Sequence, residues 1–155
     1  MRVWVNGWFW DRPAIGSGQY LRHLTRSLAA LEEAPTLGLV LPWAGAVSEI
    51  PQGVQVAAAW RGPARPRVWG KLWFEQQIFP RFCQKERADV ALVPYWASPL
   101  VSHCPVVVTI HDLVPLLFPE YRGGILGELY LRLVVGSAKR ARLVLTDSRA
   151  SQQDI

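Results

Sequence analysis

The chain alternates short apolar runs with longer stretches in which apolar residues recur every three or four positions. The short runs predict strands, because strands buried on both faces of a parallel sheet have nearly continuous apolar sequence. These runs are residues 3–5, 37–41, 54–57, 89–93, 106–110 and 143–146. Since helical stretches separate several of them, the pattern predicts an α/β domain with a mainly parallel sheet, a Rossmann-like three-layer arrangement.

Three of the longer stretches have the periodicity of helices. The first begins near Gln19 and ends before Pro35. Its apolar stripe consists of Leu21, Leu24, Leu28 and Leu31. The second covers residues 68–86 and contains Pro80, which is expected to kink it or to split it in two. The third covers about residues 125–140.

A final helix begins after Asp147 and Ser148, which have the chemistry of an N-cap. Only about two turns follow before Ile155, whereas the average helix has ~11–12 residues. A length of 155 residues suits one domain with a sizeable core. We therefore expect residues 1–155 to be a single domain of a longer protein.

Composition and charge narrow the class of protein. Half of the residues are hydrophobic and 19% are charged, which is typical of a globular domain. The net charge of +5 allows an anionic partner, but no run of basic residues indicates a nucleic-acid face. A signal-peptide pattern is missing and no apolar run reaches the ~20 residues of a membrane span. We expect a cytoplasmic protein with two reduced thiols, Cys83 and Cys104.

An imidazole and a carboxylate, His111 and Asp112, follow the most apolar strand directly. Ligands of open α/β sheets gather at the carboxyl ends of the strands, so this pair is the first candidate for a site. In the alternative interpretation His111 is a satisfied histidine at a strand end, and Asp112 caps the following turn. The three histidines have no spacing typical of a metal site, and we expect none.

A glycine segment, Gly16, Ser17 and Gly18, lies between the first strand and the first helix. The amino end of a helix is where phosphates and other anions bind. The dinucleotide-binding fingerprint fails, because its third glycine position holds Leu21. A single Gly-x-Gly leaves a ligand loop and a plain turn about equally open.

Topology decides whether these candidates belong together. If the first strand lies beside the strands near residues 90–93 and 106–110, three segments face one crevice. They are residues 16–18, the turn containing Tyr95, Trp96 and Ser98, and the pair His111 and Asp112.

The predicted helix at residues 68–87 mixes aromatic and basic side chains. Its aromatic residues include Trp69, Trp73, Phe74, Phe79 and Phe82. They favour packing on the sheet, and peripheral contact with the inner face of a membrane is the alternative. Since the aromatics circle much of the helix, we expect some of them to be exposed.

An ordered series of motifs resembles the amino-terminal domain of group 1 (family 4) glycosyltransferases. The motifs are Gly16-Ser-Gly-Gln-Tyr20, Trp73-Phe-Glu75-Gln76, Asp89-Val-Ala-Leu-Val-Pro94-Tyr95, Thr109-Ile-His111-Asp112-Leu113, Phe118-Pro-Glu-Tyr121 and Thr146-Asp147-Ser148. They extend over nearly the whole chain, and the series is more specific than any single motif.

The resemblance implies a GT-B fold, in which two Rossmann-like domains face each other and the amino-terminal one mostly binds the acceptor. The implied reaction is retaining, metal-independent transfer of a sugar from a nucleotide-sugar, the co-substrate, to a glycan or lipid-linked acceptor, without a cofactor. Cell-envelope or polysaccharide synthesis is the expected setting. By resemblance His111 contacts the donor sugar as the catalytic residue. The expected donor- and acceptor-binding residues are Gly16, Ser17, Gly18, Tyr95, Trp96, Ser98, Asp112, Asp147 and Ser148.

The residues of the implied second domain that hold the donor diphosphate are absent from this sequence. We therefore expect negligible sugar transfer by residues 1–155 alone. Two other functions remain open. One is a non-catalytic binding or scaffold domain of the same fold, and the other is half of a different GT-B enzyme, such as a sugar-nucleotide epimerase.

Overall fold

A six-stranded sheet forms the centre of the domain, in the order β3-β2-β1-β4-β5-β6. The computed structural model describes residues 1–43, 49–58, 68–96, 98–118, 120 and 124–155. Its strands are β1 (Arg2–Asn6), β2 (Thr36–Leu41), β3 (Gln55–Ala58), β4 (Val90–Val93), β5 (Val106–Thr109) and β6 (Leu143–Leu145). Every pairing between them is parallel, so the α/β fold class predicted from the sequence is confirmed.

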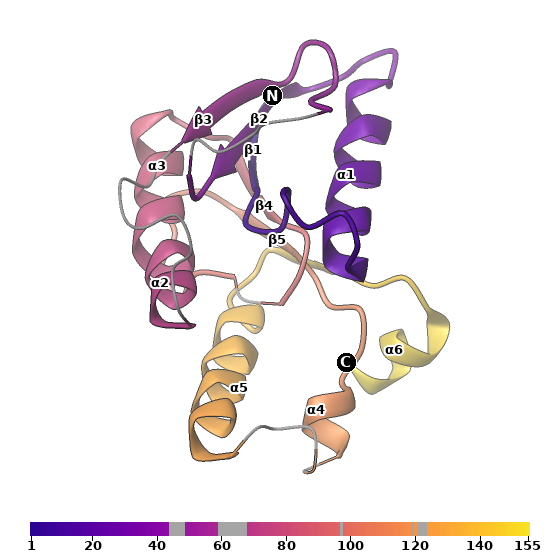
Figure 1. The fold of residues 1–155 in the computed structure, drawn as a ribbon, viewed down its shortest axis with the longest axis vertical. Coiled ribbons are helices and arrows are strands. Elements are labelled where there is room, and N and C mark those ends of the chain that lie inside the picture. The colour runs from indigo at the N-terminus through magenta and orange to yellow at the C-terminus, as the bar shows by residue number, and fades with distance from the viewer. Residues whose placement is uncertain (44–48, 59–67, 97, 119, 121–123) are drawn as a thin grey trace.

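Helices cover both faces of this sheet, with α1 on one side of the strands and α2 and α3 on the other (Figure 1). The helical elements are α1 (Gly16–Ala29), α2 (Val68–Trp73), the π-helical η1 (Phe74–Ile78), α3 (Phe79–Lys85), α4 (Val114–Leu117), α5 (Gly124–Ala138) and α6 (Arg149–Asp154). The short helix α4 follows the pair His111 and Asp112 directly.

The side-chain alternation of the strands creates two separate cores. Val3 and Val5 of β1 pack in one core with Leu21 of α1. Trp4, between them in sequence, belongs to the other core with Phe74 and Phe79. Because successive side chains of a strand point to opposite faces, each core buries one helical layer against the sheet. The three-layer architecture follows.

The long helix predicted at residues 68–86 is interrupted, as Pro80 predicts. Proline has no N–H to donate, so the regular bond to the carbonyl of Gln76 is lost. One residue earlier, the Phe79 N–H bonds to the carbonyl of Phe74, a five-residue step that defines the π turn. The turn rotates Phe74 and Glu75 into the interior, where both are fully buried.

Helix α1 differs from the prediction at both ends. It begins at Gly16, three residues before Gln19, because the amides of Gly18 and Gln19 both donate to the carbonyl of Ile15, each at 3.0 Å. The glycine segment is therefore the first turn of the helix and not a loop before it. The helix ends at Ala29, which leaves Leu31 beyond its carboxyl end and exposed.

The two glycines of this first turn have different surroundings. A Cβ atom on Gly18 would lie 2.0 Å from the carbonyl oxygen of Arg12, whereas one on Gly16 would meet nothing within 4 Å. We predict that Gly18→Ala lowers the free energy of unfolding by about 2 kcal/mol or more, since backbone cannot give way cheaply. The matched change Gly16→Ala should alter it by less than about 1 kcal/mol. Urea unfolding of both variants measures this, and equal effects would contradict the packing role of Gly18.

Candidate functional site

The sheet changes direction of winding between β1 and β4. From β1 the chain crosses to β2 on one side, and it later returns to β4 on the other side of β1. This arrangement is a topological switch point, where ligands bind beyond the carboxyl ends of the strands. The shared crevice predicted from the sequence requires that the first strand lie beside both later strands. This strand pairs with β4 directly, and β5 is one strand further along.

His111 and Asp147 meet at this carboxyl edge. His111 follows β5 and Asp147 follows β6, two paired neighbours. The Nδ1 atom of His111 lies 3.0 Å from Oδ2 of Asp147. The other ring nitrogen, Nε2, is buried and has no hydrogen-bond partner among the described residues. The carboxylate therefore holds one side of the imidazole and leaves the other side unpaired.

Tyr20 of α1 packs against the same imidazole. The two ring centroids are 4.7 Å apart and the planes are nearly perpendicular, at 86°. The Tyr20 hydroxyl lies 3.3 Å from Oγ1 of Thr109, the last residue of β5. Tyr20 was not among the site residues predicted from the sequence, although it ends the Gly-x-Gly-x-Tyr motif. Its place in that motif, after Gly16 and Gly18, is the sequence signal that could have identified it.

Asp112 and Ser148 hold the backbone around this pair. Oδ1 of Asp112 accepts the Val114 N–H at 2.9 Å, which is the turn-capping role considered as the alternative. Oγ of Ser148 accepts the Ser151 N–H at 3.0 Å, so Ser148 is the N-cap of α6. The Ser151 hydroxyl in turn donates to the His111 carbonyl at 2.7 Å. Helix α6 is thus fastened to the backbone of the histidine.

The amino end of α1 presents Gly16 and Ser17 to the surface. Gly16 is exposed and Ser17 is partly exposed, whereas Gly18 is buried. The close approach at Gly18 is to the carbonyl of Arg12, and contact of Gly18 with a ligand stays a prediction. Among the described residues, no hydrogen bond satisfies the Gly16 and Ser17 amides. Such amides at the start of a 14-residue helix attract anions.

The structure places the side chains of Tyr95 and Ser98 in the interior, and a role of either residue in binding stays a prediction. Both side chains are buried, and the Tyr95 hydroxyl donates to Oδ1 of Asn6 at 2.8 Å. The carbonyl of Ser98 accepts from the Gln76 amide at 3.1 Å. Trp96 is partly exposed and lines an apolar cavity of about 290 Å³ together with α5 residues. Of this turn, Trp96 alone keeps an accessible side chain among the three predicted residues.

A buried ion pair that was not predicted from the sequence lies against the face of the sheet covered by α2 and α3. Nζ of Lys71 lies 2.5 Å from Oε1 of Glu75, which is fully buried by the π turn. Burial raises the pKa of Glu75 to about 7, and the Lys71 ammonium limits the rise. Glu75 stands in the Trp-Phe-Glu-Gln motif, but only the π turn shows that its carboxylate points inward.

Aromatic side chains surround the Lys71 ammonium. It lies 5.1 Å from the ring centroids of Tyr95 and Tyr130 and 5.7 Å from that of Phe9. It also donates to the Tyr130 hydroxyl at 2.8 Å. These contacts join residues after β1 and β4 to helices α2 and α5.

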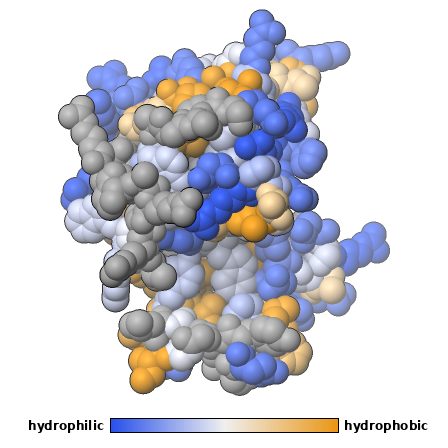
Figure 2. Space-filling model, in the orientation of Figure 1, coloured by the Kyte–Doolittle hydropathy of each residue, from blue (hydrophilic) through white to orange (hydrophobic). Residues whose placement is uncertain are grey.

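The outer side of this helical layer exposes two indoles. Trp69 is 67% and Trp73 is 53% exposed, whereas Phe74 and Phe79 are buried in the core. Figure 2 shows further hydrophobic surface at the lower end of α5. Packing on the sheet thus holds for the buried aromatics of this helix, and some of its aromatics are exposed, as expected. None of the described helices is long and apolar enough to span a bilayer. Peripheral membrane contact stays a prediction.

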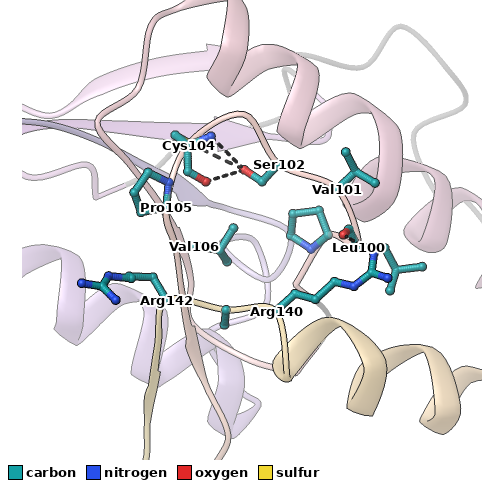
Figure 3. Close-up of a pocket in the computed structure, with 10 residues that line it drawn as sticks. Leu100, Val101, Ser102, Cys104, Pro105, Val106, Arg140 and Arg142 are labelled. Atoms are coloured by element: carbon teal, nitrogen blue, oxygen red, sulfur yellow. Dashed lines mark hydrogen bonds between the residues drawn. The ribbon is translucent and has the colours of Figure 1, made fainter.

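A pocket of about 530 Å³ lies at the opposite, amino-terminal edge of β5, away from the predicted site residues (Figure 3). Its lining includes Ser102, Cys104, Arg140 and Arg142. Cys104 and the buried Cys83 are both free thiols in the structure. A hydrogen bond with Cys83 lowers the pKa of Cys104 to about 6.

Within the described part of the chain, no three His, Cys, Asp or Glu side chains cluster as metal ligands.

The chain was compared with models of known protein families. The model described as Glycosyltransferase Family 4 matches residues 15–155, which include all the candidate site residues. No curated protein matches the chain. The matched region begins at Ile15, the N-cap residue of α1, and includes the residues that follow β4, β5 and β6 at the carboxyl edge.

The raised pKa of Glu75 predicts a pH-dependent stability. The folded state keeps the proton between about pH 4.5 and 7 while the unfolded state has lost it. Stability therefore falls as pH rises through this window, by about 3 kcal/mol at ~1.36 kcal/mol per pKa unit. Glu75→Gln should remove this fall, so the difference between the two proteins in urea unfolding isolates it. Parallel pH profiles would contradict the buried titration.

Proposed function

The chain belongs to glycosyltransferase family 4, and we propose that it is the acceptor-binding domain of a retaining, metal-independent glycosyltransferase. The proposed reaction moves a sugar from a nucleotide-sugar to a glycan or lipid-linked acceptor. The observation that carries the proposal is the imidazole of His111, held by Asp147 at the carboxyl edge with its Nε2 atom unpaired.

The pairing with Asp147 determines what His111 can offer a sugar. A carboxylate accepts hydrogen bonds, so the Nδ1 atom carries the proton and Nε2 keeps its lone pair. Nε2 is buried in the unliganded structure, so the neighbouring side chains must shift when the donor binds for Nε2 to accept a hydrogen bond from a sugar hydroxyl beside the reacting carbon. The edge contact with Tyr20 fixes the ring plane. In this mechanism His111 orients the sugar, and Asp147 stabilises positive charge that develops on the imidazole.

The amino end of α1 supplies a second element of the proposed site. The unpaired amides of Gly16 and Ser17 carry the positive end of the helix dipole, equivalent to roughly half a unit charge. A phosphate group of the donor is the ligand that this end suits best. Tyr20, one turn further along α1, touches the imidazole, so one helix addresses both the phosphate and the sugar-contacting histidine.

Replacement of the imidazole tests the proposal. We predict that His111→Ala lowers kcat of the complete enzyme about 100-fold, because a preorganised contact to the reacting sugar is lost. The free energy of unfolding should stay close to that of the unaltered protein. His103, an exposed histidine, provides the matched control, and His103→Ala should leave transfer unchanged.

Transfer from a nucleotide-sugar to the acceptor is measured for both variants, and for residues 1–155 alone, where it should be negligible. Unchanged turnover of His111→Ala would contradict the assignment of the histidine. Clear turnover by residues 1–155 alone would contradict the role as one half of an enzyme.

A further inference from the structure

A charged group that the proposed mechanism does not use lies at the switch point itself. Phe9 follows β1 and Tyr95 follows β4, and these strands are neighbours on either side of the switch. The Lys71 ammonium lies over both rings, within 5.7 Å of their centroids. It therefore occupies the same carboxyl edge as His111, on the face covered by α2 and α5.

The ammonium has a free donor. Of its three N–H groups, one faces Oε1 of Glu75 and one donates to the Tyr130 hydroxyl. No acceptor for the third is found among the described residues. The Lys71 side chain is 23% exposed and is the accessible member of the pair, whereas Glu75 is fully buried and cannot touch a ligand. Lys71 therefore faces the ligand, and Glu75 acts only through it.

Charge balance determines which ligands this donor favours. The Glu75 carboxylate cancels the ammonium charge at a distance of 2.5 Å, so the pair as a whole presents little net charge. An anion gains little from such a pair, but a neutral hydroxyl still gains a hydrogen bond. The partly exposed rings of Phe9 and Tyr130 add flat apolar surface on either side. Aromatic walls with a few placed donors are typical of small-molecule sites.

We propose that Lys71 is a specificity-determining residue that donates to a hydroxyl of an uncharged acceptor sugar, and that Glu75 positions it and cancels its charge. This inference rests on the proposed function and names the class of acceptor. Removal of the Glu75 charge leaves the ammonium uncompensated and turns the subsite toward anionic sugars.

Other groups around the pair do not offset this charge balance. Tyr95 faces it from the turn after β4 and Tyr130 from α5, and burial raises the pKa of both hydroxyls above the usual range. They stay neutral below pH 9. Asn6 at the end of β1 is uncharged. Protonation of Glu75 below about pH 7 therefore has the same effect on Lys71 as removal of its charge.

Matched pairs of sugars test the proposal. The probes are the methyl glycosides of glucose, galactose and mannose, each paired with the corresponding methyl glycoside of the uronic acid. Their affinities for residues 1–155 are measured by NMR titration at pH 8.5, where Glu75 is ionised. At least one neutral glycoside should bind more tightly than its uronate partner. Lys71→Met should weaken that binding about tenfold.

The charge argument gives a sharper expectation for Glu75→Gln. The ratio of uronate to neutral affinity should rise about tenfold or more at pH 8.5, because one unit charge near the ligand is uncovered. In the unaltered protein the same rise should occur on lowering the pH to 5.5, and Glu75→Gln should show no such pH dependence. The double variant Lys71→Met/Glu75→Gln, which removes both charges, should bind the neutral glycoside as weakly as Lys71→Met does and should show no pH dependence. It serves as the folded reference if Glu75→Gln is unstable.

An unchanged ratio in Glu75→Gln would overturn the proposal, and so would equal binding by Lys71→Met or a lack of binding by every glycoside. These results are independent of the proposed function, because sugar transfer that depends on His111 would persist in an enzyme whose acceptor site ignores charge. Conversely, charge-selective binding without any transfer activity would overturn the proposed function alone.

Discussion

The position of β1 between β2 and β4 is the constraint on which the rest of the structure depends. One crossover connects β1 to β2 on one side of β1, and a later crossover connects β3 to β4 on its other side. Because parallel crossovers are right-handed, two that run in opposite directions along the sheet lie on opposite faces. The crossover through α1 therefore covers one face, and the crossover through α2, η1 and α3 covers the other. The carboxyl ends of β1 and β4 lie between these two connections, so the residues that follow them meet at one edge.

Two polar pairs flank this edge, and their energetics differ. The pair of His111 and Asp147 is partly exposed, so it costs little and serves to orient one ring. The pair of Lys71 and Glu75 places a carboxylate in the interior. The loss of its hydration costs more free energy than the attraction to Lys71 contributes, so the pKa of the carboxyl group is raised. An apolar pair of similar volume would be at least as stable there. The cost of Glu75 is therefore better explained by what Lys71 presents to a ligand than by stability.

The sequence predicted the elements whose signal is local. The β-branched run before His111 and the helical spacing of the leucines from Leu21 onward were enough to predict the fold class. The series of motifs was enough to predict the family. The rest depends on tertiary contacts. The start of α1 depends on how Arg12 packs against Gly18, and the burial of Tyr95 on a hydrogen bond to Asn6. The inward direction of Glu75 needs the extra residue of a π turn, which shifts the helical period that sequence reasoning assumes.

The protonation state of the His111 ring tests the central claim most directly, because the claim needs Nε2 as an acceptor. Two-bond ¹H–¹⁵N NMR correlation at pH 8 distinguishes the two neutral tautomers of a histidine. The account predicts that the proton resides on Nδ1, facing Asp147, and that Asp147→Ala removes this preference. A proton on Nε2 in the unaltered protein, or the same tautomer after Asp147→Ala, would contradict the account.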